Sequence, residues 1–198
     1  MRSSTFICGW PKVRFRQLLL REFAPYGELS EAQLDQLEGH YERLIKWNQK
    51  LNLTRIEGIE EAVRFHYGES LYLASKLPTG RLQVMDVGSG AGFPGFPIAV
   101  LRPECKVTLV ESHQRKAVFL RESARALKNV DVIADRAEGI NAAYDWIVAR
   151  AVRPASVLDL PNSSSFALLV GGSDASGFRE SLRIPWGSDR HLVFHVKP

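Results

Sequence analysis

The sequence predicts an α/β domain built on a doubly wound, mostly parallel sheet, preceded by a helical N-terminal extension. From Leu82 onward, short apolar runs alternate with amphipathic stretches, which is the pattern of strands and helices in a parallel sheet. The runs are apolar on both sides, as expected for strands covered by helices on both faces. We therefore expect helices in residues 1–78 and the sheet in 79–198, packed as one compact domain.

The extension contains two predicted helices. Ser30 and Gln33 have the spacing of a capping box, in which the two side chains satisfy exposed backbone N–H groups. A helix should follow and end near residues 48–54, because apolar residues recur at helical spacing, at Leu34, Leu37, Tyr41, Leu44 and Ile45. A second helix is expected over 59–77, and the turn of residues 78–80 ends it.

The core pattern continues as alternating strands and helices. Strands are expected at 82–87, 106–111, 130–135 and 144–152, with helices at 96–103 and 112–128. Beyond Ala151 the pattern weakens. Further strands are expected there at 166–172 and 190–196, with loops at 162–165 and 171–177.

Composition narrows the class of protein. The 198 residues are 45% hydrophobic, enough to bury a core without disulfides or metals. Cys8 and Cys105 are far apart and form no metal-binding pattern, so a reducing cytoplasm is the simplest setting. There is no apolar run of 18 residues and no export signal, so we expect a cytoplasmic protein that does not enter a membrane. The net charge of +4 permits a polyanionic partner without requiring one.

A glycine motif, Gly88-x-Gly90-x-Gly92, follows the first strand and precedes a helix. This is the context of a nucleoside-binding turn, where glycine lets a ligand lie against the backbone. No Gly-Lys-Ser/Thr follows, which excludes a P-loop. A dinucleotide spacing appears only when counted from Gly90, and it places Pro94 inside the turn. A tight connection without any ligand is the alternative.

Two acids help to choose the ligand. Glu111 ends the second strand, where a carboxylate can accept hydrogen bonds from the ribose of either NAD or S-adenosylmethionine. The alternative is an acid that simply faces solvent. Asp86 would repel a pyrophosphate but suits the ammonium and sulfonium charges of S-adenosylmethionine, so it favours a methyl donor. A buried acid that caps N–H groups of the loop would fit the same fold.

Several motifs together resemble one family. The segments "DVGSGAGFPG", "VTLVESHQRKAVFLRE", "DRAEGI" and "YDWIVARAV", with "KWNQKLNLT" and "RFHYGESL" upstream, are similar to the bacterial RsmG (GidB) small-subunit rRNA methyltransferases. The resemblance covers about residues 30–152, and "IPWGSDRHLVFHVKP" matches more loosely. It implies a class I S-adenosylmethionine-dependent methyltransferase with a Rossmann-like sheet.

The resemblance also implies a reaction, N7-methylation of the guanine at position 527 of 16S rRNA. The partner would be 16S rRNA or the 30S subunit, and the protein a monomer without a metal. Guanine N7 carries a free lone pair, so no catalytic residue is assigned. Arg150 is expected beside the cofactor and the incoming base, although it could be an ordinary strand-end charge. The complete set of cofactor-binding candidates is Gly88, Gly90, Phe93, Glu111, Ala137, Glu138 and Arg150.

Two further groups have an open interpretation. His66 and Glu69 lie one helical turn apart and could shape the mouth of the pocket or dock the N-terminal helices. The basic face of the 112–128 helix, with Arg121, Arg125 and Lys128, could contact RNA phosphates or only face solvent.

The chain departs from the family between Ala151 and Pro185, where it is shorter than the resemblance leads us to expect. Its fifth strand ends in Gly171-Gly172, where the family has a Lys-Gly pair. A non-catalytic RNA-binding or cofactor-sensing relative is therefore an alternative. An NAD(P) oxidoreductase is a weaker one, because no Tyr/Lys or His dyad is in place.

Overall fold

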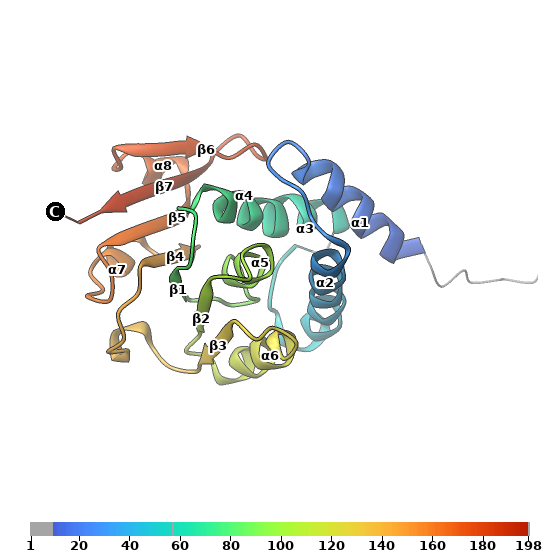
Figure 1. Ribbon diagram of the computed structural model, residues 1–198, viewed down its shortest axis with the longest axis horizontal. Coiled ribbons are helices and arrows are strands. Elements are labelled where there is room, and N and C mark those ends of the chain that lie inside the picture. Colours follow the sequence, from blue (N-terminus) through green and yellow to red (C-terminus); the bar gives the residue numbers. More distant parts are fainter. Residues whose placement is uncertain (1–9, 57, 198) are drawn as a thin grey trace, which may run out of the picture.

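The computed structural model describes residues 10–56 and 58–197 and contains one seven-stranded sheet (Figure 1). The strand order is β3-β2-β1-β4-β5-β7-β6. The first five strands of this order pair in parallel, and β7 runs antiparallel to both of its neighbours. The doubly wound α/β prediction is therefore confirmed. The strands are β1 Gln83–Val87, β2 Lys106–Val110, β3 Val130–Ile133, β4 Trp146–Arg150, β5 Ser165–Gly171, β6 Glu180–Arg183 and β7 Arg190–Val196.

The central strands are apolar on both sides because each face of the sheet has its own core. Successive side chains point to opposite faces. Val84 and Val148 pack into one core with the longer helices. Met85 and Ile147 pack into the other. The strand at the β3 edge is only half-buried, because no strand covers its outer side.

Helices of very different length cover the two faces. Figure 1 shows α4, α5 and α6 on one side of the sheet, with α2 outside them, and α7 on the other side. The helices are α1 Trp10–Phe23, α2 Glu31–Leu51, α3 Ile59–Ala62, the π-helical turn η1 Val63–Gly68, α4 Glu69–Lys76, α5 Gly95–Leu101, α6 Gln114–Ala124, the 3-10 turn η2 Ala137–Gly139, α7 Pro154–Leu158 and α8 Gly172–Ala175.

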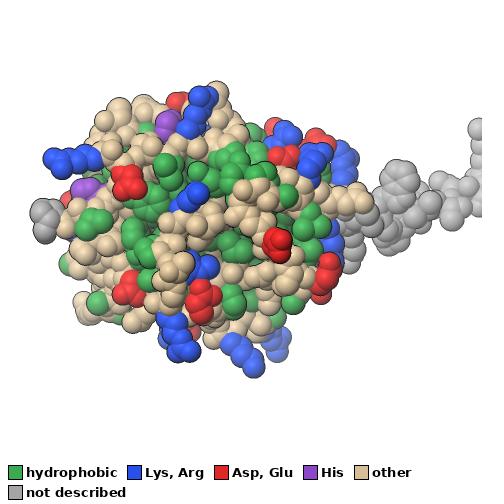
Figure 2. Space-filling model, turned by 45° about the horizontal axis from the view of Figure 1, so that its top comes forward, with side chains coloured by type: hydrophobic (Ala, Val, Ile, Leu, Met, Phe, Trp, Pro, Cys, Tyr) green, Lys and Arg blue, Asp and Glu red, His purple; other side chains and the backbone are tan. Residues whose placement is uncertain are grey.

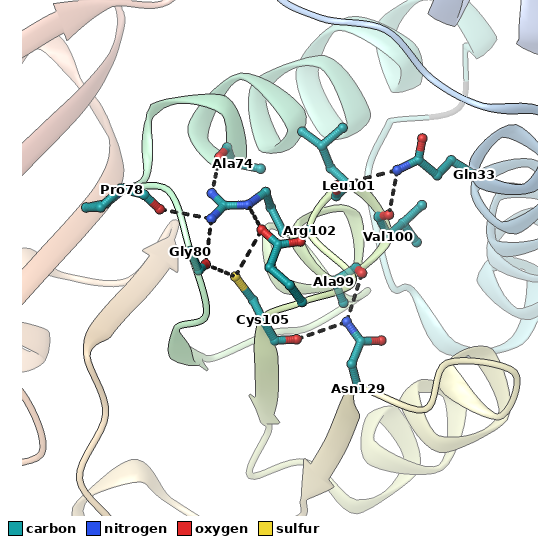
Figure 3. Close-up of polar contacts among 11 residues, drawn as sticks. Gln33, Ala74, Pro78, Gly80, Ala99, Val100, Leu101, Arg102, Cys105 and Asn129 are labelled. Atoms are coloured by element: carbon teal, nitrogen blue, oxygen red, sulfur yellow. Dashed lines mark hydrogen bonds and ion pairs between the residues drawn. The ribbon is translucent and has the colours of Figure 1, made fainter.

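The extension shares its core with the sheet. Phe15 of α1 and Leu37 of α2 belong to the same buried cluster as Val84 of β1. The predicted capping box is confirmed, since the Ser30 and Gln33 side chains and backbones bond reciprocally. Gln33 Nε2 also donates to Val100 O at 3.0 Å, which ties the start of α2 to the end of α5 (Figure 3).

The helix predicted over 59–77 is confirmed to Lys76, although it includes the π-helical turn η1. Three α-helices and one strand were not predicted. One of them is the helix α1. The segment 171–177, expected to be a loop, contains α8. The short helix α7 and the strand β6 were not predicted, because β6 is the polar segment Glu-Ser-Leu-Arg at a sheet edge and has no apolar run.

Arg102 bridges the last turn of α4 and the loop between α4 and β1, at the edge where the strands begin, opposite the glycine motif. Its guanidinium donates to Pro78 O at 2.9 Å, Gly80 O at 3.0 Å and Ala74 O at 3.4 Å (Figure 3). Nearby, Asn129 Nδ2 donates to two further carbonyls, each at 3.0 Å. Five N–H donors in a planar fork make arginine suited to this bridging. The contacts fix the end of α4 against the start of the sheet.

The arginines of α1 are paired with acids. Arg14 bonds Glu60 at 2.5 Å and Arg21 bonds Glu22 at 2.7 Å. Arg16 contacts three acids on α2, including the buried Glu38 at 2.7 Å. Figure 2 shows basic and acidic side chains mixed together at the end of the molecule that carries α1. Arg2 and Cys8 lie outside the described residues, and Cys105 is a buried free thiol.

No helix in the described ranges 10–56 and 58–197 is both long enough and apolar enough to cross a membrane.

Candidate functional site

The glycine motif forms the tight turn that its sequence predicts. Gly88, Gly90 and Gly92 have φ angles of 69°, 57° and 91°, in the left-handed region that favours glycine. A Cβ on Gly88 would lie 2.9 Å from Val152 Cγ2, closer than real Cβ contacts allow. The Gly88 N–H donates to Val110 O at 2.9 Å, which ties the turn to the end of β2. The turn therefore accepts glycine alone at position 88 without local rearrangement.

Glu111 holds this turn from the end of β2. Its Oε2 accepts a hydrogen bond from the Gly90 N–H at 2.9 Å, and its Oε1 accepts one from the His113 N–H at 2.8 Å. The residue is 8% exposed, so it is not an acid that simply faces solvent. A carboxylate oxygen can accept more than one hydrogen bond. Each oxygen of Glu111 thus retains acceptor capacity while it positions the loop.

Asp86 caps the far side of the same turn. Its Oδ2 accepts from the Gly95 N–H at 2.9 Å, and the residue is fully buried. Burial raises the pKa of Asp86 to about 7, and the Gly95 N–H only partly offsets this. Asp86 lines neither of the two cavities described next. The structure thus agrees with a buried acid that caps loop N–H groups.

A small cavity of about 240 Å³ opens where β1 and β2 end. Three of the predicted cofactor residues, Gly88, Ala137 and Glu138, line it together. One part of its wall is apolar and another carries short polar and charged side chains. The remaining lining residues are Val87, Val110, Ser112, Asp135, Arg136, Val152, Ser156, Val157 and Leu160. A planar ring could lie between such walls with its polar edge toward the acids.

A large cleft of about 1620 Å³ lies beside the small cavity. Val152 lines both spaces and is their shared wall. The cleft carries four arginines and two aspartates, Arg55, Arg150, Arg153, Arg190, Asp174 and Asp189. Its other walls come from Asn48 and residues 52–56, from Phe65 and His66, from 151–152 and 169–171, and from 187–188. Its volume exceeds the range usual for small-molecule pockets.

Arg150 lies at the end of β4, with its side chain 16% exposed. Its Nη1 donates to Phe65 O at 2.5 Å and its Nη2 to His66 Nδ1 at 2.6 Å. The guanidinium also lies over the Phe93 ring, 5.3 Å from its centroid. Burial lowers the pKa of Arg150 to about 10, while the Glu69 carboxylate opposes that change. Arg150 thus stays charged at neutral pH and is not an ordinary strand-end charge.

Phe93, Gly90 and Glu111 lie behind the cavities rather than in their walls. Phe93 is 3% exposed and stacks on His66 with centroids 4.6 Å apart. It forms the base on which Arg150 and His66 rest. The structure therefore brings four of the seven predicted residues to cavity walls and uses the other three as their support.

His66 and Glu69 both belong to this support. Glu69 is fully buried and accepts from Arg190 Nη2 at 2.7 Å, with Arg150 Nη1 at 3.9 Å. Burial raises the pKa of Glu69, and Arg190 and Arg150 counteract the rise. His66 lines the cleft, while Glu69 connects the helical extension to β4 and β7. His66 therefore contributes to the wall of the pocket, and Glu69 docks the N-terminal helices.

The matching family model, described as rRNA small subunit methyltransferase G (GidB), covers residues 33–163. The chain belongs to this family. Ribosomal RNA small subunit methyltransferase G of Staphylococcus saprophyticus is 38% identical over 149 residues, which are 71% of this chain and 62% of that protein. The protein of the same name from Bacillus cereus is 39% identical over 154 residues, 73% of this chain and 63% of the relative. The chain thus spans about three fifths of the length of these relatives.

Solved structures show the fold of this family member. A SAM-dependent methyltransferase from Aquifex aeolicus superposes with a TM-score of 0.54 at 14% identity, covering 70% of this chain and 93% of that one. A SAM-dependent O-methyltransferase from Thermotoga maritima gives a TM-score of 0.53 at 15% identity, covering 78% and 71%. The predicted class I methyltransferase fold is confirmed.

Three residues that support or line the site, His40, Asn48 and Thr54, were not predicted from the sequence. His40 of α2 is fully buried; its Nε2 donates to Ala91 O at 3.0 Å, and its Nδ1 lies 2.7 Å from Tyr67 Oη. Asn48 bonds both the N–H and the C=O of Thr54, at 2.9 and 3.0 Å. A histidine on an apolar helix face gives no signal of a loop contact. The segment "NQKLNLT" indicates a helix end and belongs to a motif of the family resemblance, but the sequence pattern assigns no contact to Asn48 or Thr54.

Proposed function

We propose that this protein transfers a methyl group from S-adenosylmethionine to N7 of a guanine in 16S rRNA, the guanine that corresponds to position 527. One observation carries the proposal: a small cavity at the glycine turn and a large arginine-bearing cleft share the Val152 wall, with Arg150 on the cleft side. A methyltransferase needs two adjoining sites of this kind, one for the donor and one for the acceptor. Membership of the family supplies the reaction and the RNA.

The small cavity fits a nucleoside cofactor. Gly88 leaves the space that any Cβ would fill, and the apolar walls at Ala137 and Val110 suit an adenine ring. Glu138 borders that space, and Glu111 retains acceptor capacity beside the turn. We assign the cofactor to Gly88, Gly90, Phe93, Glu111, Ala137, Glu138 and Arg150, of which Gly90 and Phe93 act from behind the wall.

The chemistry asks the protein for position rather than for proton transfer. When bound, S-adenosylmethionine supplies an electrophilic methyl group on a sulfonium sulfur. Guanine N7 has a lone pair on the Hoogsteen edge and carries no proton, so no residue has to act as a base. Arg150 is held by Phe65 O and His66, so it can orient a base without reorganisation.

The large cleft suits a nucleic acid. Its arginines outnumber its aspartates by four to two, and Arg55 and Arg153 are exposed. Arginine binds phosphate with two parallel hydrogen bonds. We infer that these two residues contact the RNA backbone while Arg150 contacts the base. Arg121 of α6, together with Arg125 and Lys128 just after this helix, is exposed and offers further phosphate contacts.

A direct test is incubation with 30S subunits, or with 16S rRNA, and S-adenosylmethionine, followed by mass spectrometry of the nucleosides. We expect N7-methylguanine from the wild type and none from an Arg150→Ala variant. Calorimetric titration should show binding of S-adenosylhomocysteine and none of NADH. Binding of NADH alone would contradict the proposal.

A non-catalytic relative is the second candidate, supported by the end of β5. Residues 169–171 line the cleft, and the strand ends in Gly171-Gly172 without a lysine. A chain that binds S-adenosylhomocysteine and RNA but forms no N7-methylguanine would have this second function. We further propose that the protein is cytoplasmic and that it is a monomer. Light scattering of the purified protein tests the monomer.

A further inference from the structure

The neighbours of Thr54 determine whether its hydroxyl group can donate or accept a further hydrogen bond. Thr54 is half-buried and lines the large cleft just after α2. Asn48 bonds the backbone of Thr54 on both sides, at 2.9 and 3.0 Å. The position of Thr54 in the wall is therefore fixed by backbone contacts that do not involve its side chain.

The proton positions in this part of the wall follow from Arg150. A guanidinium can only donate, so His66 Nδ1, at 2.6 Å from Arg150 Nη2, must be the acceptor. Burial, followed by the charge of Arg150, lowers the pKa of His66 to about 2, so the ring is neutral. Its single proton is then on Nε2. That nitrogen lies 2.7 Å from Thr54 Oγ1 and donates to it.

Thr54 Oγ1 accepts a second hydrogen bond, from the Ile56 N–H at 3.0 Å. A hydroxyl group has two acceptor lone pairs and one proton. Both lone pairs are used, by His66 and by Ile56. The hydroxyl proton remains, and the open side of Thr54 is the cleft. Thr54 thus offers a ligand a donor and no free acceptor.

We propose that Thr54 selects guanine over adenine by donating its hydroxyl proton to O6 of the base. This inference rests on the proposed function and names the residue that reads the base at that site. Guanine presents two acceptors on its Hoogsteen edge, N7 and O6. Adenine presents the acceptor N7 but an amino donor at position 6, which would face the Thr54 proton. A base presented by N7 toward the cofactor brings its 6-substituent to the neighbouring wall.

The test compares binding of RNAs that differ only at position 6 of the target base. The probe is a 16S rRNA hairpin with guanine or 2,6-diaminopurine at the target position, titrated by fluorescence anisotropy against the protein loaded with S-adenosylhomocysteine. The wild type should prefer guanine by about 5- to 20-fold. Thr54→Val should bring the preference to within about twofold, and Thr54→Ser should retain it. Any displacement of His66 in Thr54→Val would weaken both RNAs equally and leave the ratio unchanged.

A second series needs only the wild type and so does not depend on the folding of a variant. Affinity should fall in the order guanine, 6-thioguanine, 2-aminopurine, 2,6-diaminopurine, as the 6-substituent changes from acceptor to donor. Equal affinities, a preference for diaminopurine, or an unchanged ratio in Thr54→Val would each overturn the proposal.

The outcome for Thr54 is separate from the outcome for the reaction. The same RNA samples, incubated with S-adenosylmethionine, are analysed for N7-methylguanine. If the ratio responds to Thr54→Val and no N7-methylguanine forms, the proposed reaction fails and the donor role of Thr54 stands. If N7-methylguanine forms and the ratio does not respond, the reaction stands and Thr54 is excluded.

Discussion

Arg150 and His66 lie 84 residues apart in the chain, yet Nη2 of the first is 2.6 Å from Nδ1 of the second. This contact joins the end of β4 to η1 of the helical extension. Both groups are largely buried, so neither can move without breaking a hydrogen bond in a low-dielectric setting. The site therefore depends on the two parts of the chain together.

Replacement of Arg150 by lysine should reduce kcat/KM at least about 10-fold, although the charge is kept. An ammonium group lacks the planar fork with which Arg150 bonds Phe65 O and His66 Nδ1 at once. Methyl transfer to 30S subunits measures the effect. Arg81→Lys is the matched control, because Arg81 is exposed and lines neither the cleft nor the small cavity, and it should change the rate less than about twofold. Equal losses in both variants would contradict a specific role for Arg150.

Gly88→Ala should weaken binding of S-adenosylhomocysteine at least about 10-fold, because the new Cβ displaces Val152, the wall of the small cavity. Gly80→Ala is the control. Gly80 also has a positive φ, of 99°, but its Cβ would meet open space. Both variants should lose about 1 to 2 kcal/mol of stability through backbone strain. In calorimetry only Gly88→Ala should lose affinity, and an equal loss in Gly80→Ala would point to strain alone.

The two buried histidines should make the protein less stable in acid. Burial, as the largest cause, lowers the pKa of His40 from 6.5 to about 3 and that of His66 from 6.5 to about 2. Below pH 6.5 the unfolded chain binds protons that the folded chain does not, so unfolding becomes easier as the pH falls. Each histidine should contribute a loss of about 2 kcal/mol between pH 6.5 and 5.

Asp86 acts in the opposite direction over part of this range. Its pKa is raised from 3.8 to about 7, so the folded chain binds its proton first and gains stability as the pH falls through 7.

The difference between wild type and His40→Gln in urea unfolding at several pH values isolates the histidine. The slope should flatten in His40→Gln and stay unchanged for the exposed His113→Gln. Parallel slopes in all three proteins would show that folding does not lower the pKa of His40.

Arg102→Ala should lower the free energy of unfolding by about 1 to 3 kcal/mol, because the α4–β1 loop loses hydrogen bonds from a charged donor. The bonds to Pro78 O and Gly80 O, at 2.9 and 3.0 Å, are broken (Figure 3). Since Arg102 lies at the opposite edge of the sheet from the glycine turn, the affinity for S-adenosylhomocysteine should be unchanged. Denaturant unfolding and calorimetry on one preparation check both statements. A loss of affinity would show that the two edges are coupled.

The sequence sufficed for the five parallel strands and β7, because burial leaves apolar runs along them. The capping box at Ser30 could also be predicted, since it depends on two residues that are only three positions apart in the sequence. β6 and α7 were not, because they are short and are formed by contacts with β7 and β5 rather than by local pattern. Periodicity carries no information about such contacts.

For the site, the sequence identified residues by their place at strand ends, and these indeed gather at one edge. The sequence could not show which of these residues line the cavities and which lie behind the cavity walls. Phe93 and Glu111 were predicted beside a ligand, but their side chains hold Arg150, His66 and the glycine turn from below. His40 and Thr54 were missed, because their partners are distant in the chain or depend on the proton of a third residue.

The bond from His40 to Ala91 has a consequence for how the protein can be divided. The glycine turn is not completed by the sheet alone, since a side chain from α2 holds its carbonyl. A cut at Pro78 would separate the fragment that carries the turn from the residue that shapes it. The extension is thus a structural part of the glycine turn, and a fragment that keeps the shape of this turn has to begin before α2.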